Sequence, residues 1–502
     1  MSLDANLAPH QALRLNLARA STRRQFLKRS QTGLGAIALA MLMGQDGRAG
    51  ATDADALASV VADNPMAPKP PSHPAKAKHV IYLHMSGGPP QQDLFDYKPL
   101  LNKFHLKPCP DELLMGQRFA FIKGHPKLLG TPYKFAKRGE SGQWMSDLLP
   151  HTAGVIDETV VIRSMQTTEF NHAPAELFMF TGTPRNGGAA MGSWITYGLG
   201  SENQDLPGFV VMISGGTDPT GGKALWSTAF LPSVFQGVQC RTVGDPVLYV
   251  GNPPGMSRDD RRRTLDTLRQ LNEHELNEYG DPETLTRINQ YELAFRMQMS
   301  VPDVMDIRQE PEHVRAMYGA EPGASSFANN CLLARRLVER GVRYVQLFDW
   351  GWDCHGTGKH DDIVYHLPGK CKEIDRPVAA LIADLKRRGL LDETIVVWGG
   401  EFGRTSMNEA RGGSTFLGRD HHPGNFTLWA AGGGFKAGAA VGSTDDLGAS
   451  VVEDPVTVHD LQATILHLLG LNPHTFRFPY QGLQQRLIGV EDDGRVRKEL
   501  LA

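Results

Sequence analysis

Six short apolar runs, rich in β-branched and aromatic residues, recur along the chain and are the main constraint on its fold. They are HVIYLHM (79–85), TVVIRSM (159–165), FVVMI (209–213), VRYVQLF (342–348), TIVVW (394–398) and FTLWA (426–430). Most of them are apolar at consecutive positions, which is typical of central strands that are covered on both faces. We therefore expect a buried sheet built from segments that are far apart in sequence.

Segments with helical periodicity lie between several of these runs. They cover 261–279, 324–341, 373–389 and 457–470. Two of them end in a glycine after basic residues, which is a common signal for the C-terminus of a helix. Strands that alternate with helices predict an α/β fold with a doubly wound, mostly parallel sheet and helices on both faces.

The first 51 residues resemble an export signal. STRRQFLKRS (21–30) contains the adjacent Arg23 and Arg24, a small and apolar run follows, and AGA (49–51) suits cleavage by a signal peptidase. This pattern is typical of a twin-arginine signal, and the alternative is an uncleaved amphipathic anchor. The interpretation predicts a periplasmic or extracellular protein. The apolar run is short for a membrane span, so we expect no stable transmembrane segment after removal of the signal.

The remaining sequence divides into a linker and one large domain. Residues 52–78 are rich in Ala and Pro, so we interpret them as a linker. Residues 79–502 are expected to form a single α/β domain, with an insertion at about 215–320 that contains Gly/Pro loops and a charged helix. The formal net charge of -3 gives no reason to expect nucleic acid as a partner. Five cysteines without a CxxC pair disfavour a disulfide framework and a zinc–thiolate site.

Polar residues follow the predicted strands, at the sheet edge where open α/β sheets bind ligands. The residues at these strand ends are Asp93 and Asp96, Asn171 and His172, Asp349, Asp353 and His355, and Glu401 and Arg404. The segment GRDHHP is an exception in polarity, because its Asp420, His421 and His422 precede a strand. We expect the long loop after Glu401 to return them to the same edge.

Histidine and carboxylate side chains together indicate a metal centre. This mixed set suits Zn, Mn or Fe, whereas an all-oxygen set suits Ca or Mg. We therefore expect a divalent cofactor, Zn or Mn rather than Ca or Mg, as one ion or two. The alternative is that these loops hold unrelated caps and turns, since each residue taken singly is a weak signal.

Several motifs, taken together, resemble a known family. DRPVAALIADLKRRGLLDETIVVWGGEFGRT (375–405) is similar to the segment that carries a metal-binding Asp-His-Gly in sulfatases and other alkaline-phosphatase superfamily enzymes, and HAPAELFMFTG (172–182) is similar to their nucleophile segment. The set SGGPPQQDLFDYKP, NHAPAE, GWDCHG, GGEFGRT, GRDHHP and YQGLQQRL resembles the DUF1501 family, a sulfatase-like group. This resemblance implies a sulfatase-like α/β domain with loop or cap insertions.

The resemblance also implies a set of metal ligands. These are Asp93, Asp353, His355, Glu401 and His421. Two positions depart from the superfamily pattern, because Phe402 replaces a metal-binding histidine and His172 replaces the usual nucleophile precursor. His172 is then a ligand, a nucleophile or a neighbour of a helix cap, and we expect a ligand.

The remaining candidates concern the substrate. Arg404 is expected to act in catalysis by clamping a sulfate or phosphate, and Arg419, His422 and Asn171 are expected to line the substrate site. The alternative for both arginines is a structural role in binding backbone. The main hypothesis is an exported, metal-dependent hydrolase of sulfate or phosphate esters that acts on a small molecule or a glycan. The rival is a non-catalytic, metal-stabilised protein that binds anionic glycans or cell-surface partners.

Replacing Arg23 and Arg24 together by lysine is expected to leave the protein in the cytoplasm, because the pathway reads the arginine pair. The fold should not change, since the pair lies in a segment that we expect to be removed. Cell fractionation measures the effect, with Lys28→Arg as a control outside the pair. Export of the double variant at the wild-type level would contradict the twin-arginine interpretation.

Overall fold

The computed structural model describes residues 64–116, 119–248, 251–279, 282–490 and 494–502. The predicted twin-arginine segment lies outside these residues, as does the beginning of the predicted linker. Within the described residues, no helix combines the length and the apolar character that crossing a membrane requires.

All six apolar runs form strands of one sheet, as predicted. They are β1 (His79–Ser86), β5 (Thr159–Gln166), β6 (Phe209–Ser214), β8 (Tyr344–Trp350), β9 (Thr394–Gly399) and β13 (Phe426–Ala431). Three short strands extend the sheet, namely β7 (Val238–Gln239), β14 (Ala439–Val441) and β17 (Val456–Thr457). The strand order is β14-β5-β13-β9-β1-β8-β6-β7, and β17 also pairs with β5.

The sheet is parallel except at β13. β1 pairs in parallel with β8 and β9, whereas β13 runs antiparallel to both β9 and β5. Phe426, at the start of β13, therefore lies opposite Met165, near the end of β5. This reversal explains why Asp420 and His421 precede their strand, because the amino end of β13 lies at the carboxyl edge of its neighbours.

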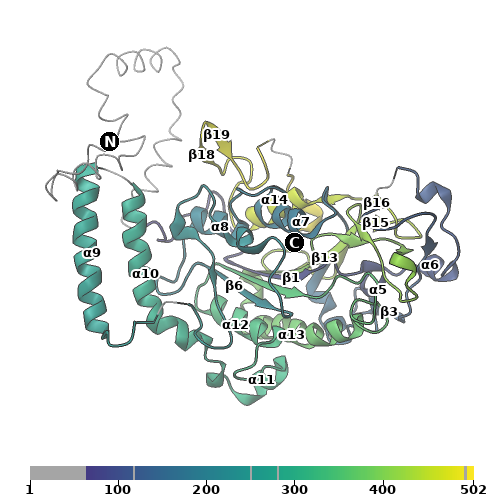
Figure 1. Ribbon diagram of the computed structural model, residues 1–502, viewed down its shortest axis with the longest axis horizontal. Coiled ribbons are helices and arrows are strands. Elements are labelled where there is room, and N and C mark those ends of the chain that lie inside the picture. Colours follow the sequence, from purple (N-terminus) through teal and green to yellow (C-terminus); the bar gives the residue numbers. More distant parts are fainter. Residues whose placement is uncertain (1–63, 117–118, 249–250, 280–281, 491–493) are drawn as a thin grey trace, which may run out of the picture.

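Helices cover both faces of the sheet, as predicted (Figure 1). Residues Ile81, Leu83 and Met85 of β1 belong to the same buried cluster as α12 (Phe327–Glu339) and α13 (Leu367–Arg387). The alternating residues Val80 and Tyr82 belong to the opposite cluster, with α7 (His172–Thr181), α8 (Met191–Leu199) and α14 (Val458–Leu468). Each fully buried aliphatic side chain of this kind contributes about 1.5–3 kcal/mol, so the two cores stabilise the sheet from both sides.

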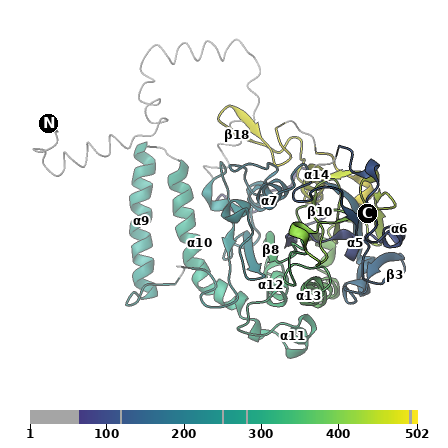
Figure 2. The same cartoon turned by 45° about the vertical axis from the view of Figure 1, so that its right-hand side comes forward.

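The predicted insertion contains a helical hairpin that stands beside the sheet (Figures 1 and 2). α9 (Arg258–Tyr279) and α10 (Pro282–Met305) pack side by side, and Arg262 forms two hydrogen bonds to Glu292 at 2.6 and 2.9 Å. α9 covers the charged helix that we predicted at 261–279. All five cysteines are buried, and each is a free thiol in the structure.

Residues 64–78, which we expected to form the end of a linker, lie against the domain instead. The backbone N–H of Lys69 donates to the carbonyl of Leu199 at 2.9 Å, and that of Lys76 donates to Leu468 at 2.8 Å. This stretch contains no helix or strand, as its proline content predicts. Its hydrogen bonds to the ends of α8 and α14 nevertheless make it part of the folded body, which begins earlier than the sequence indicates.

Gly418→Ala is expected to destabilise the protein, because a Cβ at this position would lie 1.9 Å from the carbonyl carbon of His355 and 2.1 Å from the amide nitrogen of Gly356. Backbone atoms cannot move aside cheaply, so we expect a loss of at least about 1–3 kcal/mol in urea unfolding. The control is Gly369→Ala in α13, where the added Cβ meets no atom within 4 Å. Equal stability of the two variants would contradict the close approach of these loops.

Candidate metal centre

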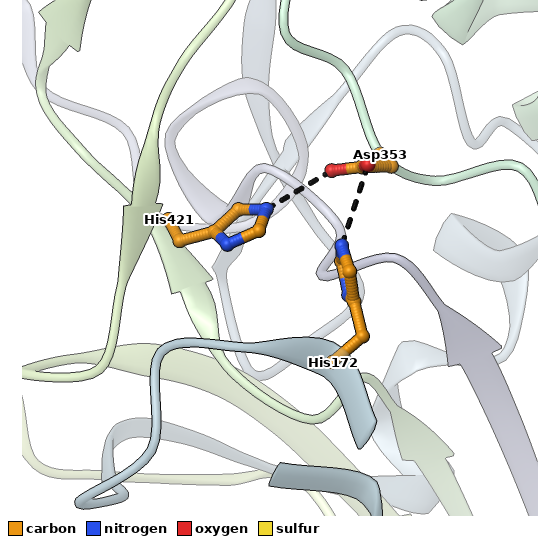
Figure 3. A group of neighbouring side chains, drawn as sticks. All are labelled: His172, Asp353 and His421. Carbon is orange, nitrogen blue, oxygen red and sulfur yellow. Dashed lines mark hydrogen bonds and ion pairs between the residues drawn. The ribbon is translucent and has the colours of Figure 1, made fainter. Parts of the chain in front are cut away.

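Two histidines and one aspartate from three separate segments meet at the carboxyl edge of the sheet (Figure 3). His172 is the first residue of α7, Asp353 follows β8, and His421 lies in β12 (His421–His422), just before β13. His172 Nε2 lies 3.3 Å from Asp353 Oδ2, and His421 Nε2 lies 3.2 Å from Asp353 Oδ1. We call these three residues the outer site.

The hydrogen bonds of His421 determine which ring nitrogen carries the proton. Nδ1 lies 2.7 Å from the carbonyl oxygen of Phe170, which only accepts, so Nδ1 carries the hydrogen. Burial lowers the pKa of His421 to about 4, opposed by Asp353 and helped by Arg404, so the ring is neutral at pH 7. Nε2 therefore presents a lone pair to a carboxylate oxygen of Asp353. Two acceptors repel each other at this distance, and a cation between them removes the repulsion.

A buried carboxylate orients His172. Its Nδ1 lies 2.6 Å from Glu401 Oε1, so Nδ1 carries a proton and Nε2 is directed toward Asp353. Among the described residues, Nε2 has no partner with hydrogen-bond geometry. Burial opposes protonation of the ring, but Asp353 and Glu401 outweigh it and raise the pKa of His172 to about 9. A carboxylate behind a histidine is the usual support of a metal ligand, and the metal replaces the proton on Nε2.

The separations in the outer site also fit a metal ion. Ligand atoms around a tetrahedral ion with bonds of about 2.0–2.1 Å lie roughly 3.3 Å apart. In the outer site His172 Nε2 lies 3.3 Å from one oxygen of Asp353 and His421 Nε2 lies 3.2 Å from the other, and both distances exceed the usual length of about 2.9 Å for an N–H···O hydrogen bond. Two imidazoles and one carboxylate leave positions open for water or a substrate, as catalytic sites of this kind do.

Two further side chains hold Asp353 in place. His355 Nε2 lies 2.8 Å from Asp353 Oδ1, and Arg404 Nη2 donates to the same oxygen. Nδ1 of His355 in turn contacts the carboxylate of Glu409. Burial raises the pKa of Asp353, but Arg404 and the neighbouring histidines outweigh it and hold that pKa well below its usual range. Asp353 is therefore ionised and oriented before any cation binds.

Two phenylalanine rings pack against the histidines of the outer site. The ring of Phe402 lies 5.0 Å from that of His172 and 4.5 Å from that of His421, between centroids. Phe121 meets His421 edge-on at 5.5 Å. Phe402, which stands where the superfamily resemblance implies a histidine ligand, thus forms an apolar wall. Such walls lower the local dielectric and strengthen the interactions of charges inside the site.

A cavity of about 640 Å³ borders the outer site at Asp353. Asp353, His355 and Arg411 lie on its wall. The guanidinium of Arg411 packs over the ring of Phe121 at 3.6 Å from the centroid, and its Nη2 lies 3.1 Å from His355 Nδ1. Asp353 of the outer site therefore borders this cavity together with a cationic side chain.

Residues 77–501 match the family described as "Protein of unknown function (DUF1501)". The chain belongs to the DUF1501 family. The match extends over nearly the whole region in which the motifs of the sequence resemble this family, which confirms that part of the resemblance. No curated protein matches the sequence.

Three solved structures show how distant the structural similarities are. The lipoteichoic acid synthase LtaP from Listeria monocytogenes is 11% identical, with 87% of this chain and 81% of that chain covered and a TM-score of 0.35. The PsFucS1 sulfatase from Pseudoalteromonas sp. is 12% identical, with coverages of 85% and 72% and a TM-score of 0.35. The alkaline phosphatase from the Antarctic bacterium TAB5 is 10% identical, with coverages of 78% and 98% and a TM-score of 0.31. Similarity this low says nothing about chemistry, which the residues of the DUF1501 chain themselves must decide.

Asp93 lies apart from the other predicted ligands. It belongs to α5 (Gln91–Leu94), and its two carboxylate oxygens accept hydrogen bonds from Arg419 at 2.8 and 3.2 Å. Arg419 also donates to the carbonyls of Leu129 and Thr405, and both charged side chains are fully buried. The prediction that Asp93 binds the metal and that Arg419 binds substrate is corrected: in the DUF1501 chain they neutralise each other inside the protein.

Arg404 is likewise a structural residue and not an anion clamp. Its side chain is fully buried, Nε donates to the carbonyl of Gly88 at 2.8 Å, and Nη1 donates to the carbonyl of Arg419 at 2.9 Å. Nη2 donates to the carbonyl of Gly87 and to the carboxylate of Asp353. The predicted catalytic contact with a substrate is therefore wrong, because the donors of Arg404 are engaged and no solvent reaches them.

The other predicted residues divide between the site and its surroundings. His422 is buried, and its Nε2 bonds the carbonyl oxygen of Ala449 at 2.8 Å, so it does not line the substrate cavity as expected. Asn171 is exposed beside His172 and forms no side-chain cap of α7, so its expected contact with substrate stays a prediction. Glu401 contacts Nδ1 of His172 and is not one of the three residues of the outer site.

Three residues that the sequence analysis did not consider also surround the centre. Arg411 lies on the cavity wall, and His84 and Glu176 lie beneath Glu401. His84 is inside strand β1 and Glu176 is inside helix α7, so a search of the residues that follow strands does not find them. The sequence offered one signal for these residues, which is that His84 stands between the apolar Leu83 and Met85 of a predicted strand.

The affinity for Zn²⁺ is expected to fall roughly tenfold for each unit by which the pH is lowered from about 8 to 6, because the ion must displace the proton from His172. The affinity falls as the pH is lowered because the pKa of His172 is raised to about 9, and below that pH metal-free His172 is protonated. Competition titration with a chelating dye measures the affinity. His172→Gln, which removes this proton, should flatten the slope, and a pH-independent affinity of the wild type would contradict the assignment.

Proposed function

We propose that the chain is an exported, metal-dependent hydrolase of sulfate or phosphate esters. The observation that carries the proposal is the outer site itself, where a neutral His421 Nε2 faces the Asp353 carboxylate at 3.2 Å beside an open cavity. The motif resemblance to sulfatases and alkaline phosphatases supports the reaction class. The substrate class is a sulfated or phosphorylated small molecule or glycan.

His172, Asp353 and His421 would hold a divalent ion, which would supply Lewis acidity toward an ester oxyanion and lower the pKa of water. Zn²⁺ or Mn²⁺ suits two imidazoles and one carboxylate better than Ca²⁺ or Mg²⁺ does. Arg411 lies on the cavity wall with its side chain 36% exposed, which supports the proposal that it binds the anionic group of a substrate. It takes the role that the sequence analysis gave to Arg404 and Arg419.

The residues around the outer site favour water as the attacking group. Nδ1 of His172 is occupied by Glu401, and its Nε2 faces Asp353, so no free nitrogen remains for attack. Burial raises the pKa of the neighbouring Cys354 thiol to about 12, which keeps it protonated and unreactive. Asp353, fixed by His355 and Arg404 and with its pKa held well below its usual range, is too weak a base to take a proton from that water and is expected only to accept a hydrogen bond from it.

A non-catalytic role is the second candidate, favoured by the histidine at position 172 where a hydroxyl or thiol nucleophile is expected. The same ion would then stabilise a site that binds anionic glycans or cell-surface partners without turning them over. Export by the twin-arginine route, to the periplasm or the exterior, is part of both proposals and rests on Arg23 and Arg24.

The test is hydrolysis of a panel of aryl sulfates, phosphate monoesters and phosphate diesters by Zn²⁺- or Mn²⁺-loaded protein. His421→Ala is expected to remove the bound outer ion and to lower kcat/KM by roughly 10²-fold or more, since the Lewis acid is lost. Arg411→Ala should raise KM about tenfold while metal content is unchanged. The matched control is Arg308→Ala, an exposed arginine elsewhere on the surface.

Two results separate the candidates. Metal-loaded protein that turns over none of these esters, yet binds sulfated glycans in an Arg411-dependent way, would replace the hydrolase by the binding protein. Turnover that persists undiminished in His421→Ala would contradict the outer site as the catalytic centre.

A further inference from the structure

A second group of ligand-type side chains lies beneath the outer site. It consists of His84 in β1, Glu176 in α7 and Glu401 in the loop after β9, and we call it the inner site. All three side chains have 0% solvent exposure. The rings of Phe180 and Phe348 pack against His84, with centroids 5.0 and 5.5 Å away. Buried charged groups of this kind are costly unless they are paired or coordinate a metal.

Each carboxylate of the inner site accepts hydrogen bonds from residues outside that site. Glu176 Oε2 accepts from the hydroxyl of Thr220 at 2.8 Å and from the N–H of Gly221 at 2.7 Å. Glu401 Oε1 contacts Nδ1 of His172 at 2.6 Å, and the N–H of Gly87 reaches Oε1 at 2.9 Å and Oε2 at 3.3 Å. One oxygen of each carboxylate thus has two donors outside the site, while Glu176 Oε1 and Glu401 Oε2 face His84.

His84 faces these two oxygens without hydrogen-bonding to either. Its Nε2 lies 3.3 Å from Glu401 Oε2 and 3.7 Å from Glu176 Oε1. Within the described part of the chain, neither ring nitrogen of His84 has a partner with hydrogen-bond geometry, and Glu176 Oε1 has none either. Fully buried groups left in this state are rare and require an explanation such as an ion or a water.

The geometry of the inner site suits a cation between the three atoms. Bonds of about 2.0–2.1 Å to a tetrahedral ion place ligand atoms roughly 3.3 Å apart, close to the observed 3.3 and 3.7 Å. A direct N–H···O⁻ hydrogen bond would bring nitrogen and oxygen to about 2.7–2.9 Å. The outer hydrogen bonds on both carboxylates correspond to the supporting contacts that orient metal ligands.

We propose that His84 Nε2, Glu176 Oε1 and Glu401 Oε2 bind a second, fully buried divalent transition-metal ion such as Zn²⁺ or Mn²⁺. One imidazole and two carboxylates provide the mixed nitrogen and oxygen donors that these ions accept. The ion offsets the charge of the two enclosed carboxylates and joins β1, α7 and the loop after β9. This inference does not rest on the proposed hydrolase activity, because it concerns metal content and stability.

Glu401 connects the inner site with the outer site. One of its oxygens faces the inner site, and the other accepts the Nδ1 proton of His172, an outer ligand. An inner ion therefore fixes the carboxylate that orients His172. The expected consequence is that loss of the inner ion weakens the outer one, while loss of the outer ion leaves the inner one bound.

The test is the metal content of the full chain, loaded with Zn²⁺, freed of excess metal and measured by inductively coupled plasma mass spectrometry. The wild type is expected to hold about two equivalents, of which the partly exposed outer one leaves first on treatment with EDTA. Glu176→Gln should lose the EDTA-resistant equivalent and unfold at a lower temperature than the wild type does. His421→Ala should keep that equivalent. The matched control is Gln346→Met, a buried polar position paired with Tyr82 on the neighbouring strand, which should keep both.

A proton is the rival occupant, because Glu176 and Glu401 raise the pKa of His84 in spite of its burial. In that case wild type and Glu176→Gln hold the same number of ions, which would overturn the proposal. If Glu176→Gln does not fold, anomalous diffraction from Zn²⁺-loaded wild-type crystals decides between the two occupants. A peak between His84, Glu176 and Glu401 is expected, and a peak at the outer site alone would refute the inner site while preserving the outer one.

Discussion

The arrangement of the candidate metal centre depends on the carboxylate of Asp353. It lies beyond the end of β8 and receives His172 from α7, His355 from its own loop, and Arg404 and His421 from the segments on either side of the long loop before β13. One negative charge in a largely buried place thus draws together side chains from separate strands. The cost of enclosing that charge is offset by Arg404 and by the hydrogen bonds and contacts of the histidines around it.

Much of this arrangement is predictable from the sequence, because it follows from hydrophobic patterning. All six apolar runs are strands, and His172, Asp353 and His421 meet at the sheet edge where residues that follow parallel strands are expected. The direction of β13 is not encoded in its composition, since FTLWA suits either orientation. Pairing with β9 and β5 decides it, and only the pairing explains why Asp420 and His421 come before the strand.

The roles of charged residues are harder to predict from the sequence. Arg404, Arg419 and Asp93 follow or precede strands as functional residues do, but they neutralise charge and bind carbonyl groups inside the protein. A one-dimensional pattern does not distinguish an arginine that faces a cavity from one that holds two loops together, because that difference is a matter of burial. For the same reason, His84 and Glu176 are hidden in a strand and a helix whose other residues are mostly apolar.

The sequence separation of the ligands has a consequence for biosynthesis. Glu401 lies 229 residues after its partner His172, and His421 lies 68 residues after Asp353. At roughly 5–20 residues per second, a ribosome releases His172 tens of seconds before the last ligands emerge. A nascent chain therefore carries incomplete sets of donors for most of its synthesis, and metal selection is left to the compartment in which the finished chain folds. Under the proposed twin-arginine export, that compartment would be the cytoplasm, and the bound ion would reflect the metals available before transport and not those of the final environment.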